Sequence, residues 1–145
     1  MKTNKKAAYA GARKTVGALK VLVVDDDPFQ LEFIAEVLRS LGVLDITLAA
    51  SSELALQAQN RYRDGAAFDL LLCDLHMPGM DGFQLMEAIA GAGFKGALII
   101  VSGQGSTVMR SAALVAQLRR FRLLGSLEKP LDKSALSALL STLTG

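Results

Sequence analysis

The sequence predicts an α/β domain with a parallel sheet and helices on both of its faces. Short apolar runs alternate with helical segments five times between Leu19 and the C-terminus. The runs are apolar at nearly every position, which is typical of parallel strands buried on both faces. The chain has 145 residues, the size of one domain, and its single cysteine excludes an internal disulfide.

The first strand is expected at 19–24, where a run of valine and leucine ends in three aspartates. Asp27-Pro28 then begins a helix, because aspartate is a favoured N-cap and proline a favoured first helical residue. The helix is expected to end at Gly42. Apolar residues recur along it at i, i+4 spacing, with Ile34 and Leu38 beside them. This spacing predicts an apolar face that contains Phe29, Phe33, Val37 and Leu41.

The middle of the chain contains two further strand and helix pairs. A short strand is expected at 46–50, and Ser51-Ser52 caps a helix that runs to about Arg63. The third strand, 70–73, leads into Asp74. Residues 77–82 are dense in turn-forming residues, and a helix follows at 83–90.

The last third repeats the pattern. A strand at 97–101 ends at Ser102-Gly103, and a helix is expected at 107–121. A short fifth strand at 123–127 is expected to be interrupted by Gly125. After Lys129-Pro130, Asp132 can cap a final helix. The inner side of this helix carries Leu136, Leu139, Leu140 and Leu143.

Charge is distributed unevenly along the chain. Residues 1–18 carry five basic and no acidic residues, whereas the remainder has a net charge of −3. We therefore expect a flexible basic tail at 1–18 and one domain at 19–143. A tail of this kind can contact nucleic acid or anionic lipid, but a solvated terminus is the favoured interpretation, and no direct nucleic-acid binding is expected. No apolar run reaches the length of a membrane span and no signal peptide is recognisable, which predicts a cytoplasmic protein without a membrane partner.

Polar residues follow four of the five expected strands. Asp25-Asp26-Asp27 follows the first, Asp74 the third, Ser102 the fourth and Lys129 the fifth. The carboxyl ends of parallel strands meet at one edge of the sheet, where such folds bind ligands. Clustered carboxylates repel one another unless a cation lies among them, and Mg²⁺ suits carboxylate ligands. A lysine and a hydroxyl at the same edge suit a phosphoryl group, with an aspartate as a candidate nucleophile.

Four segments carry a family resemblance: VLVVDDDP, LLLCDLHMPGMDG, IIVSG and LEKPL, in this order. Together they resemble the receiver domain of two-component response regulators over about residues 19–143. The resemblance implies a flavodoxin-like (βα)5 three-layer sandwich with a five-stranded parallel sheet of order 2-1-3-4-5. It also implies a signalling domain that assists its own phosphorylation, not an enzyme that turns over an external substrate.

The resemblance implies a role for each residue at the predicted edge. Asp74 would be the phosphoacceptor, and its donor would be a phosphohistidine on a sensor histidine kinase or a histidine phosphotransfer protein. Asp26 would bind Mg²⁺ directly and Asp25 through water, with the backbone carbonyl of His76 as a further ligand.

Two residues of the fourth and fifth strands complete the implied site. Ser102 would hydrogen-bond the phosphoryl group and Lys129 would pair with it, next to a Lys129-Pro130 bond that is typically cis in this family. Ser126 stands where many receivers have an aromatic residue that reports phosphorylation, so the usual switch is incomplete.

Two alternatives stay open at this point. The first is a degenerate receiver that binds proteins without being phosphorylated. The second is a haloacid-dehalogenase-type phosphatase with Asp25 as nucleophile, which Phe29 and the lack of a later acidic pair disfavour. An output partner such as a cyclic-di-GMP phosphodiesterase (EAL) module, and a homodimer through the face formed by the helix at 107–121 and the last helix, are further hypotheses.

Overall fold

The computed structural model describes residues 14–61, 68–74, 82–103 and 122–144. The helix expected at 107–121 and most of the turn-rich loop at 77–82 lie outside these ranges. So does His76, and so do the first thirteen residues of the expected tail.

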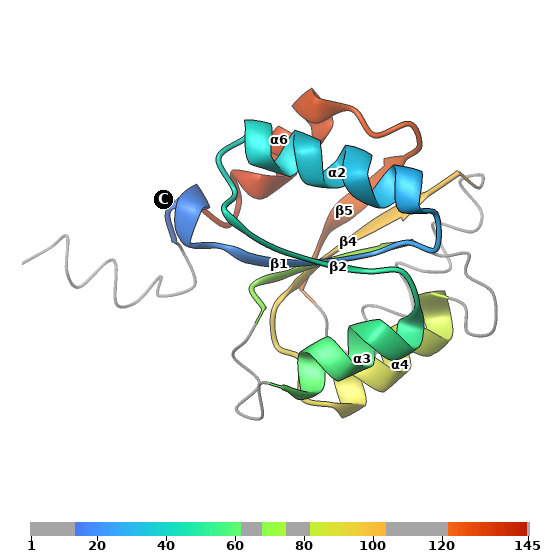
Figure 1. The fold of residues 1–145 in the computed structure, drawn as a ribbon. Coiled ribbons are helices and arrows are strands. Elements are labelled where there is room, and N and C mark those ends of the chain that lie inside the picture. Colours follow the sequence, from blue (N-terminus) through green and yellow to red (C-terminus); the bar gives the residue numbers. More distant parts are fainter. Residues whose placement is uncertain (1–13, 62–67, 75–81, 104–121, 145) are drawn as a thin grey trace, which may run out of the picture.

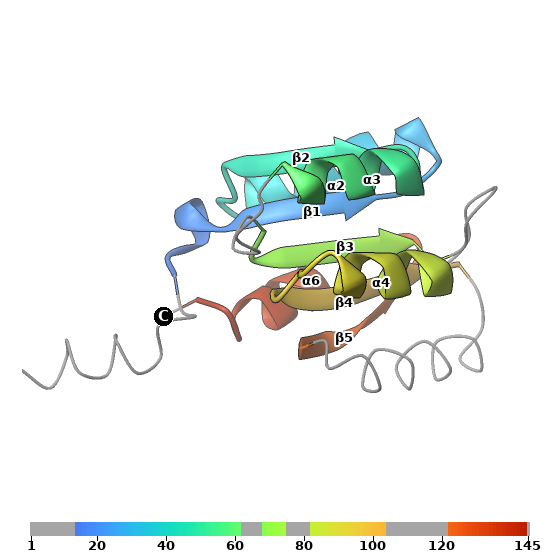
Figure 2. The same cartoon turned by 90° about the horizontal axis from the view of Figure 1, so that it is seen from below.

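Five parallel strands form one sheet, as the sequence predicts. They are β1 (Lys20–Val24), β2 (Asp45–Ala49), β3 (Leu70–Asp74), β4 (Ala97–Ser102) and β5 (Arg122–Glu128). Their order is β2-β1-β3-β4-β5, with every neighbouring pair parallel (Figures 1 and 2). The expected flavodoxin-like order 2-1-3-4-5 is therefore confirmed, and β1 lies beside β3.

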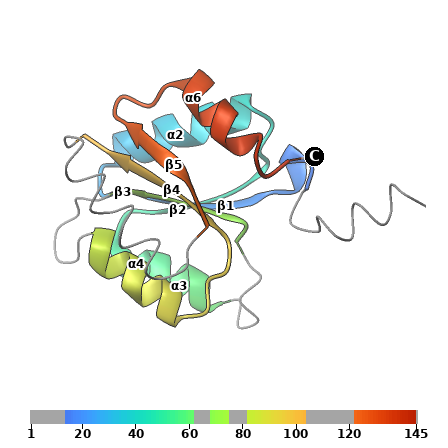
Figure 3. The same cartoon turned by 180° about the vertical axis from the view of Figure 1, so that it is seen from behind.

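Helices cover both faces of this sheet. Helices α2 (Pro28–Ser40) and α6 (Lys133–Leu140) lie on one face, and α3 (Ser52–Asn60) and α4 (Gly82–Gly91) on the other (Figures 1 and 3). Successive strand residues alternate between the faces. Val21 and Val23 therefore join the core under α2 and α6, while Leu22 and Val24 join the core under α3 and α4.

Three predicted N-caps lie within the described residues, and all three are present. The backbone N–H of Phe29 donates to the Asp27 carboxylate (2.9 Å). The Ser51 hydroxyl accepts from Leu54 N (3.1 Å) and the Asp132 carboxylate from Ala135 N (3.1 Å). Each cap satisfies one of the donors that a helix start leaves unpaired. The helix α2 is followed by Gly42 at a φ of 101°, a conformation that favours glycine.

The expected apolar face of α2 is wrong in part. Phe29 is 84% exposed and Phe33 42% exposed, while the core is met by Leu31, Ile34, Ala35 and Leu38. The physical reason is helix geometry. With 3.6 residues per turn, an i, i+4 row turns by about 40° at each step. The row thus begins in solvent at Phe29 and reaches the protein interior only near Val37 and Leu41, which are half-buried.

Gly125 does not interrupt the fifth strand, contrary to expectation. Strand β5 runs through it, with Leu98 opposite Leu123 and Ile99 opposite Gly125. Leu124 is therefore the extra residue of a bulge. A Cβ on Gly125 would lie 2.9 Å from Leu139 Cδ2, so the glycine allows α6 to pack closely on β5.

The end of the expected tail is attached to the domain. Lys14 forms a parallel β-bridge with Thr144, and its ammonium lies 3.1 Å from Asp69 Oδ1. A short 3₁₀ helix, η1 (Val16–Ala18), then leads into β1. The expected tail at 1–18 therefore includes a residue, Lys14, that contacts Asp69 and Thr144 of the domain. No helix among the described residues is long and apolar enough to span a membrane.

Candidate functional site

The carboxyl ends of four strands bring the predicted residues to one edge of the sheet. Asp25 directly follows β1, whose neighbour β3 ends in Asp74. Ser102 ends β4, and Lys129 follows the last residue of β5, which pairs with Ser102. The topology therefore brings together residues, such as Asp25 and Lys129, that are more than a hundred positions apart in the chain.

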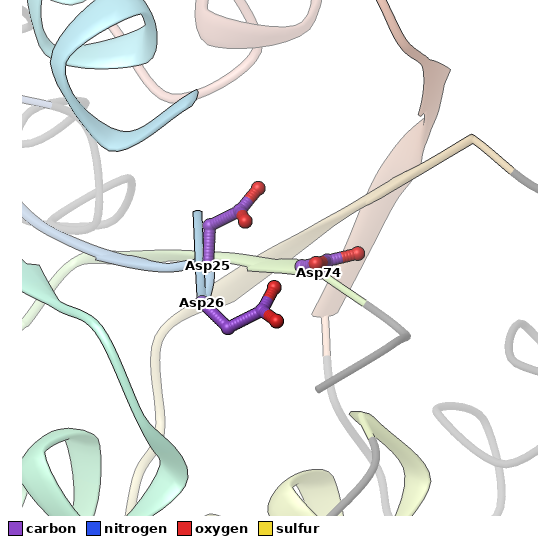
Figure 4. Close-up of side chains that lie close together, drawn as sticks. All are labelled: Asp25, Asp26 and Asp74. Atoms are coloured by element: carbon purple, nitrogen blue, oxygen red, sulfur yellow. The ribbon is translucent and has the colours of Figure 1, made fainter. Parts of the chain in front are cut away.

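Three carboxylates meet at this edge. One oxygen from each of Asp25, Asp26 and Asp74 lies within 4.8 Å of the others (Figure 4). Asp25 and Asp74 are buried, whereas Asp26 is exposed. Buried carboxylates in such proximity are costly unless positive charge lies close to them.

Lys129 supplies part of this charge. Its ammonium lies 2.8 Å from Asp25 Oδ2 and 3.4 Å from Asp74 Oδ2. Partial burial alone would lower the pKa of Lys129. The close contact with Asp25 and the negative charges of Asp25 and Asp74 outweigh that effect and raise the pKa above its ordinary value. Lys129 is therefore charged throughout the physiological range.

The backbone fixes two of these side chains. The N–H of Asp27 donates to Asp25 Oδ1 (2.9 Å), which orients the carboxylate. The N–H of Lys129 donates to the carbonyl of Ser102 (3.0 Å), so the backbone of Lys129 lies beside the last residue of β4. The Lys129-Pro130 peptide is cis, in agreement with the expectation from the resemblance.

The donor set fits a hard divalent cation. Three carboxylates and one ammonium leave a formal charge of −2 at the site. Asp25 Oδ2 is buried and, apart from its ion pair with Lys129, accepts no well-aligned hydrogen bond within the described residues. Oxygen ligands without thiolate or imidazole are the kind that Mg²⁺ prefers. One Mg²⁺ would balance the charge.

Of the other residues considered from the sequence, Ser102 lies at the same edge of the sheet as this cluster. Ser102 is fully buried at the end of β4. Asp27 caps α2, as expected, but sequence reasoning missed that its N–H also orients Asp25; three consecutive aspartates before a proline were the only signal. Cys73 packs in the core under α3 and α4, and Ser126 is exposed on β5. His76 lies outside the described residues.

Comparisons with known proteins agree with this geometry. The family model of the response regulator receiver domain matches residues 21–141. The two-component response regulator ARR14 of Arabidopsis thaliana is 34% identical over 89 residues, which are 61% of this chain and 22% of that protein. The chain spans less than a quarter of the length of the first curated relatives that it matches.

Two solved structures extend the comparison. The receiver domain of the Francisella response regulator 1452 is 27% identical with a TM-score of 0.69, over 86% of this chain and 95% of that one. The receiver domain of the Arabidopsis thaliana histidine kinase CKI1, solved in complex with Mg²⁺, is 25% identical with a TM-score of 0.68. That match covers 85% of this chain and 91% of the other. Neither the comparisons nor the site geometry gives support to the phosphatase alternative.

Proposed function

The chain belongs to the response regulator receiver domain family, and on this premise we propose that Asp74 accepts a phosphoryl group from a phosphohistidine. The observation that carries the proposal is the position of Asp74. Its carboxylate ends β3 within 4.8 Å of Asp25 and Asp26 and within 3.4 Å of the Lys129 ammonium. Acidic ligands and a cation thus surround one buried carboxylate, as phosphoryl transfer requires.

In the proposed reaction, a carboxylate oxygen of Asp74 attacks phosphorus. A P–O bond forms, the P–N bond to the donor imidazole breaks, and the imidazole leaves with the donor protein. Asp25, Asp26 and Asp74 would hold Mg²⁺, together with the backbone carbonyl of His76. When bound, the metal neutralises charge on the phosphoryl oxygens.

Lys129 and Ser102 are proposed to bind the phosphoryl group. The Lys129 ammonium already lies between Asp25 and Asp74, so it can move from a carboxylate to a phosphoryl oxygen with a small change in its side chain. Ser102 is the last residue of the neighbouring strand β4, and its hydroxyl can donate to another phosphoryl oxygen. Both groups supply the hydrogen bonds that charge-rich oxygens need.

The proposed partners follow from the family. Receiver domains interact with histidine kinases or phosphotransfer proteins, and we propose one of these as the donor. Phosphorylation would shift the domain between two conformations and change its affinity for an output partner. The EAL module, the homodimer through the face formed by the helix at 107–121 and the last helix, and a cytoplasmic location stay predictions, as does the domain range 19–143. The contacts of Lys14 favour including residues 14–18 in this domain.

The proposal is tested with beryllofluoride and Mg²⁺, which together mimic an aspartyl phosphate. Heteronuclear NMR of the wild type should show shifts at Asp25, Asp74, Ser102 and Lys129 that are absent in Asp74→Ala. Phosphoramidate should label the wild type on Asp74 and leave Asp74→Asn unlabelled. A folded wild type that shows neither shifts nor labelling would refute phosphorylation and leave the degenerate receiver as the better description.

A further inference from the structure

We propose that the outer edge of β2 is a dimer interface, at which a second copy of this chain adds its own β2 in the antiparallel direction. The two sheets would then form one continuous sheet across a two-fold axis at Thr47. This surface lies at the opposite end of the sheet from β5. It is separate from the face formed by the helix at 107–121 and the last helix, and the inference does not depend on phosphorylation of Asp74.

β2 leaves a row of backbone groups open along its outer edge. It is the first strand in the sheet order, and no described strand lies beyond it (Figure 2). The N–H of Asp25 donates to the carbonyl of Ala49 (3.2 Å), so Ala49 and, by alternation along the strand, Thr47 direct their backbone groups toward β1. The N–H and C=O groups of Ile46 and Leu48 therefore point outward, where no described strand pairs with them.

β2 also lacks the features that protect an exposed strand edge. Charged side chains, proline and bulges are the usual protection against pairing with another chain. The other edge strand, β5, has a bulge at Leu124 and charged residues at both ends, Arg122 and Glu128. β2 pairs with β1 without a register shift, and its only charged residue is Asp45 at its first position. The edge of β2 is therefore suited to receive a further strand.

The sequence of β2 is complementary to itself in an antiparallel arrangement. With the two-fold axis at Thr47, Ile46 lies opposite Leu48 of the second copy, and the two residues can exchange N–H···O=C hydrogen bonds in both directions. Both side chains are half-buried and pack on the core under α2, so each pair extends apolar surface across the interface. The same register places Leu44, which is 81% exposed, opposite the exposed Ala50 of the second copy.

The helices beside β2 permit this arrangement. α2 contacts both β1 and β2, and so does α3 on the other face, so each helix lies over the space between these two strands. Because neighbouring strands are about 4.8 Å apart, a continuous sheet puts each helix axis about 10 Å from its equivalent in the second copy. Packed helices are ~8–10 Å apart. The two α2 helices would therefore pack on each other without a clash, as would the two α3 helices.

The charges on α2 favour a second copy over an unrelated strand as the occupant. Leu41 lies on the flank of α2 that faces α6, and the helical repeat places Glu32 and Arg39 on the opposite flank, next to the edge of β2. Both charged residues are exposed. In two antiparallel α2 helices related by an axis near their middle, Glu32 of each copy meets Arg39 of the other. The same surface is thus complementary to itself, as a two-fold interface requires.

The antiparallel arrangement leaves both acidic sites accessible. The acidic edge lies at the carboxyl end of β1, which is parallel to β2. Reversing one β2 relative to the other therefore directs the acidic edges of the two copies in opposite directions. Each site could meet a phosphoryl donor without interference from the other, so the dimer is compatible with the proposed function.

The sharpest test is a disulfide between the two copies at the two-fold axis. Thr47 would face its equivalent as a pair without hydrogen bonds, with Cα atoms about 4.5 Å apart, within the ~4.4–6.8 Å that a disulfide spans. Thr47→Cys should therefore form a covalent dimer under mild oxidation, visible on a non-reducing gel. The matched control is Ser126→Cys on the other edge strand, which is exposed and should give no such dimer. The native Cys73 is buried and should not react.

Analytical ultracentrifugation of the full chain tests the interface without a covalent bond. At up to about 1 mM, the wild type should sediment with twice the mass of one 15.4 kDa chain. Glu32→Arg sets arginine against Arg39 of the second copy and should raise the dissociation constant about tenfold or more. Adding Arg39→Glu exchanges the two charges and should restore the dimer. Lys133→Glu reverses an exposed charge on α6 and should change nothing. Far-UV circular dichroism checks that each variant is folded.

Several results would overturn the inference. A wild type that is monomeric at about 1 mM would do so, as would a Thr47→Cys chain that cross-links no faster than Ser126→Cys. A dimer that Lys133→Glu dissociates and Glu32→Arg does not would move the interface to the last helix. A charge-exchanged double variant that stays as weak as Glu32→Arg would contradict the antiparallel pairing of the α2 helices.

Discussion

Replacing Lys129 with methionine tests whether its ammonium stabilises the carboxylate cluster when no divalent cation is bound. The ammonium lies 2.8 Å from Asp25 and 3.4 Å from Asp74. Methionine keeps most of the length of the side chain and removes the charge. The formal charge of the site then changes from −2 to −3, while Asp25 stays buried.

The expected magnitude follows from this geometry. Removing one partner of a fully buried ion pair costs about 3–5 kcal/mol. Lys129 keeps 20% of its side chain exposed, so water screens part of the loss. We expect the free energy of unfolding in EDTA to fall by about 2 kcal/mol.

Repulsion between an ammonium and a nearby dication in a water-like medium is about 1.5 kcal/mol, so Mg²⁺ should bind the variant about tenfold more tightly.

The assay is urea unfolding followed by far-UV circular dichroism, with EDTA or with Mg²⁺, because the chain has no tryptophan. The variant should be less stable in EDTA, and Mg²⁺ should stabilise it by more than it stabilises the wild type. Lys133→Met on the surface of α6 is the control and should stay within about 0.5 kcal/mol. Equal stability of Lys129→Met and wild type in EDTA, or an equal gain on adding Mg²⁺, would refute the reasoning.

Three further changes test other parts of the structure. Asp27→Ala removes the carboxylate that accepts from Phe29 N and should lower the free energy of urea unfolding by about 1 kcal/mol; an unchanged midpoint would contradict the cap. Gly125→Ala places a Cβ 2.9 Å from Leu139 and should cost about 1–3 kcal/mol in the same assay, so a stabilised variant would show that α6 moves aside freely. Asp26→Asn removes one carboxylate of the cluster and should weaken Mg²⁺ binding in calorimetry by about tenfold or more, whereas unchanged affinity would exclude Asp26 as a ligand.

The strands and the site could be predicted because local sequence and topology determine them. Strands buried on both faces must be apolar throughout, as Val21–Val24 and Leu70–Cys73 are. The carboxyl ends of parallel strands lie at one edge, so Asp25, Asp74 and Lys129 had to meet once the sheet was recognised. Their distances depend on tertiary packing, and the sequence did not supply them.

The errors concern features that neighbouring residues do not determine. The i, i+4 series of apolar residues on α2 winds around the helix, and tertiary packing decides which part of the series faces the sheet. The spacing alone therefore could not show that Phe29 and Phe33 face solvent. The attachment of residues 14–18 depends on Asp69 and Thr144, which are distant in the chain. Gly125 was the only local sign of the bulge at Leu124 and of the close packing of α6 on β5.

The pairing of Lys14 with Thr144 has a consequence for protein engineering. The two residues lie side by side, and Lys14 N donates to the carbonyl of Leu143 (3.2 Å). A linker of a few residues could therefore join the ends of the described domain without stretching either. New ends could then be opened beside the exposed Leu44, between α2 and β2. Such a circular permutant would keep every strand end that forms the acidic site, since Leu44 lies at the opposite edge of the sheet.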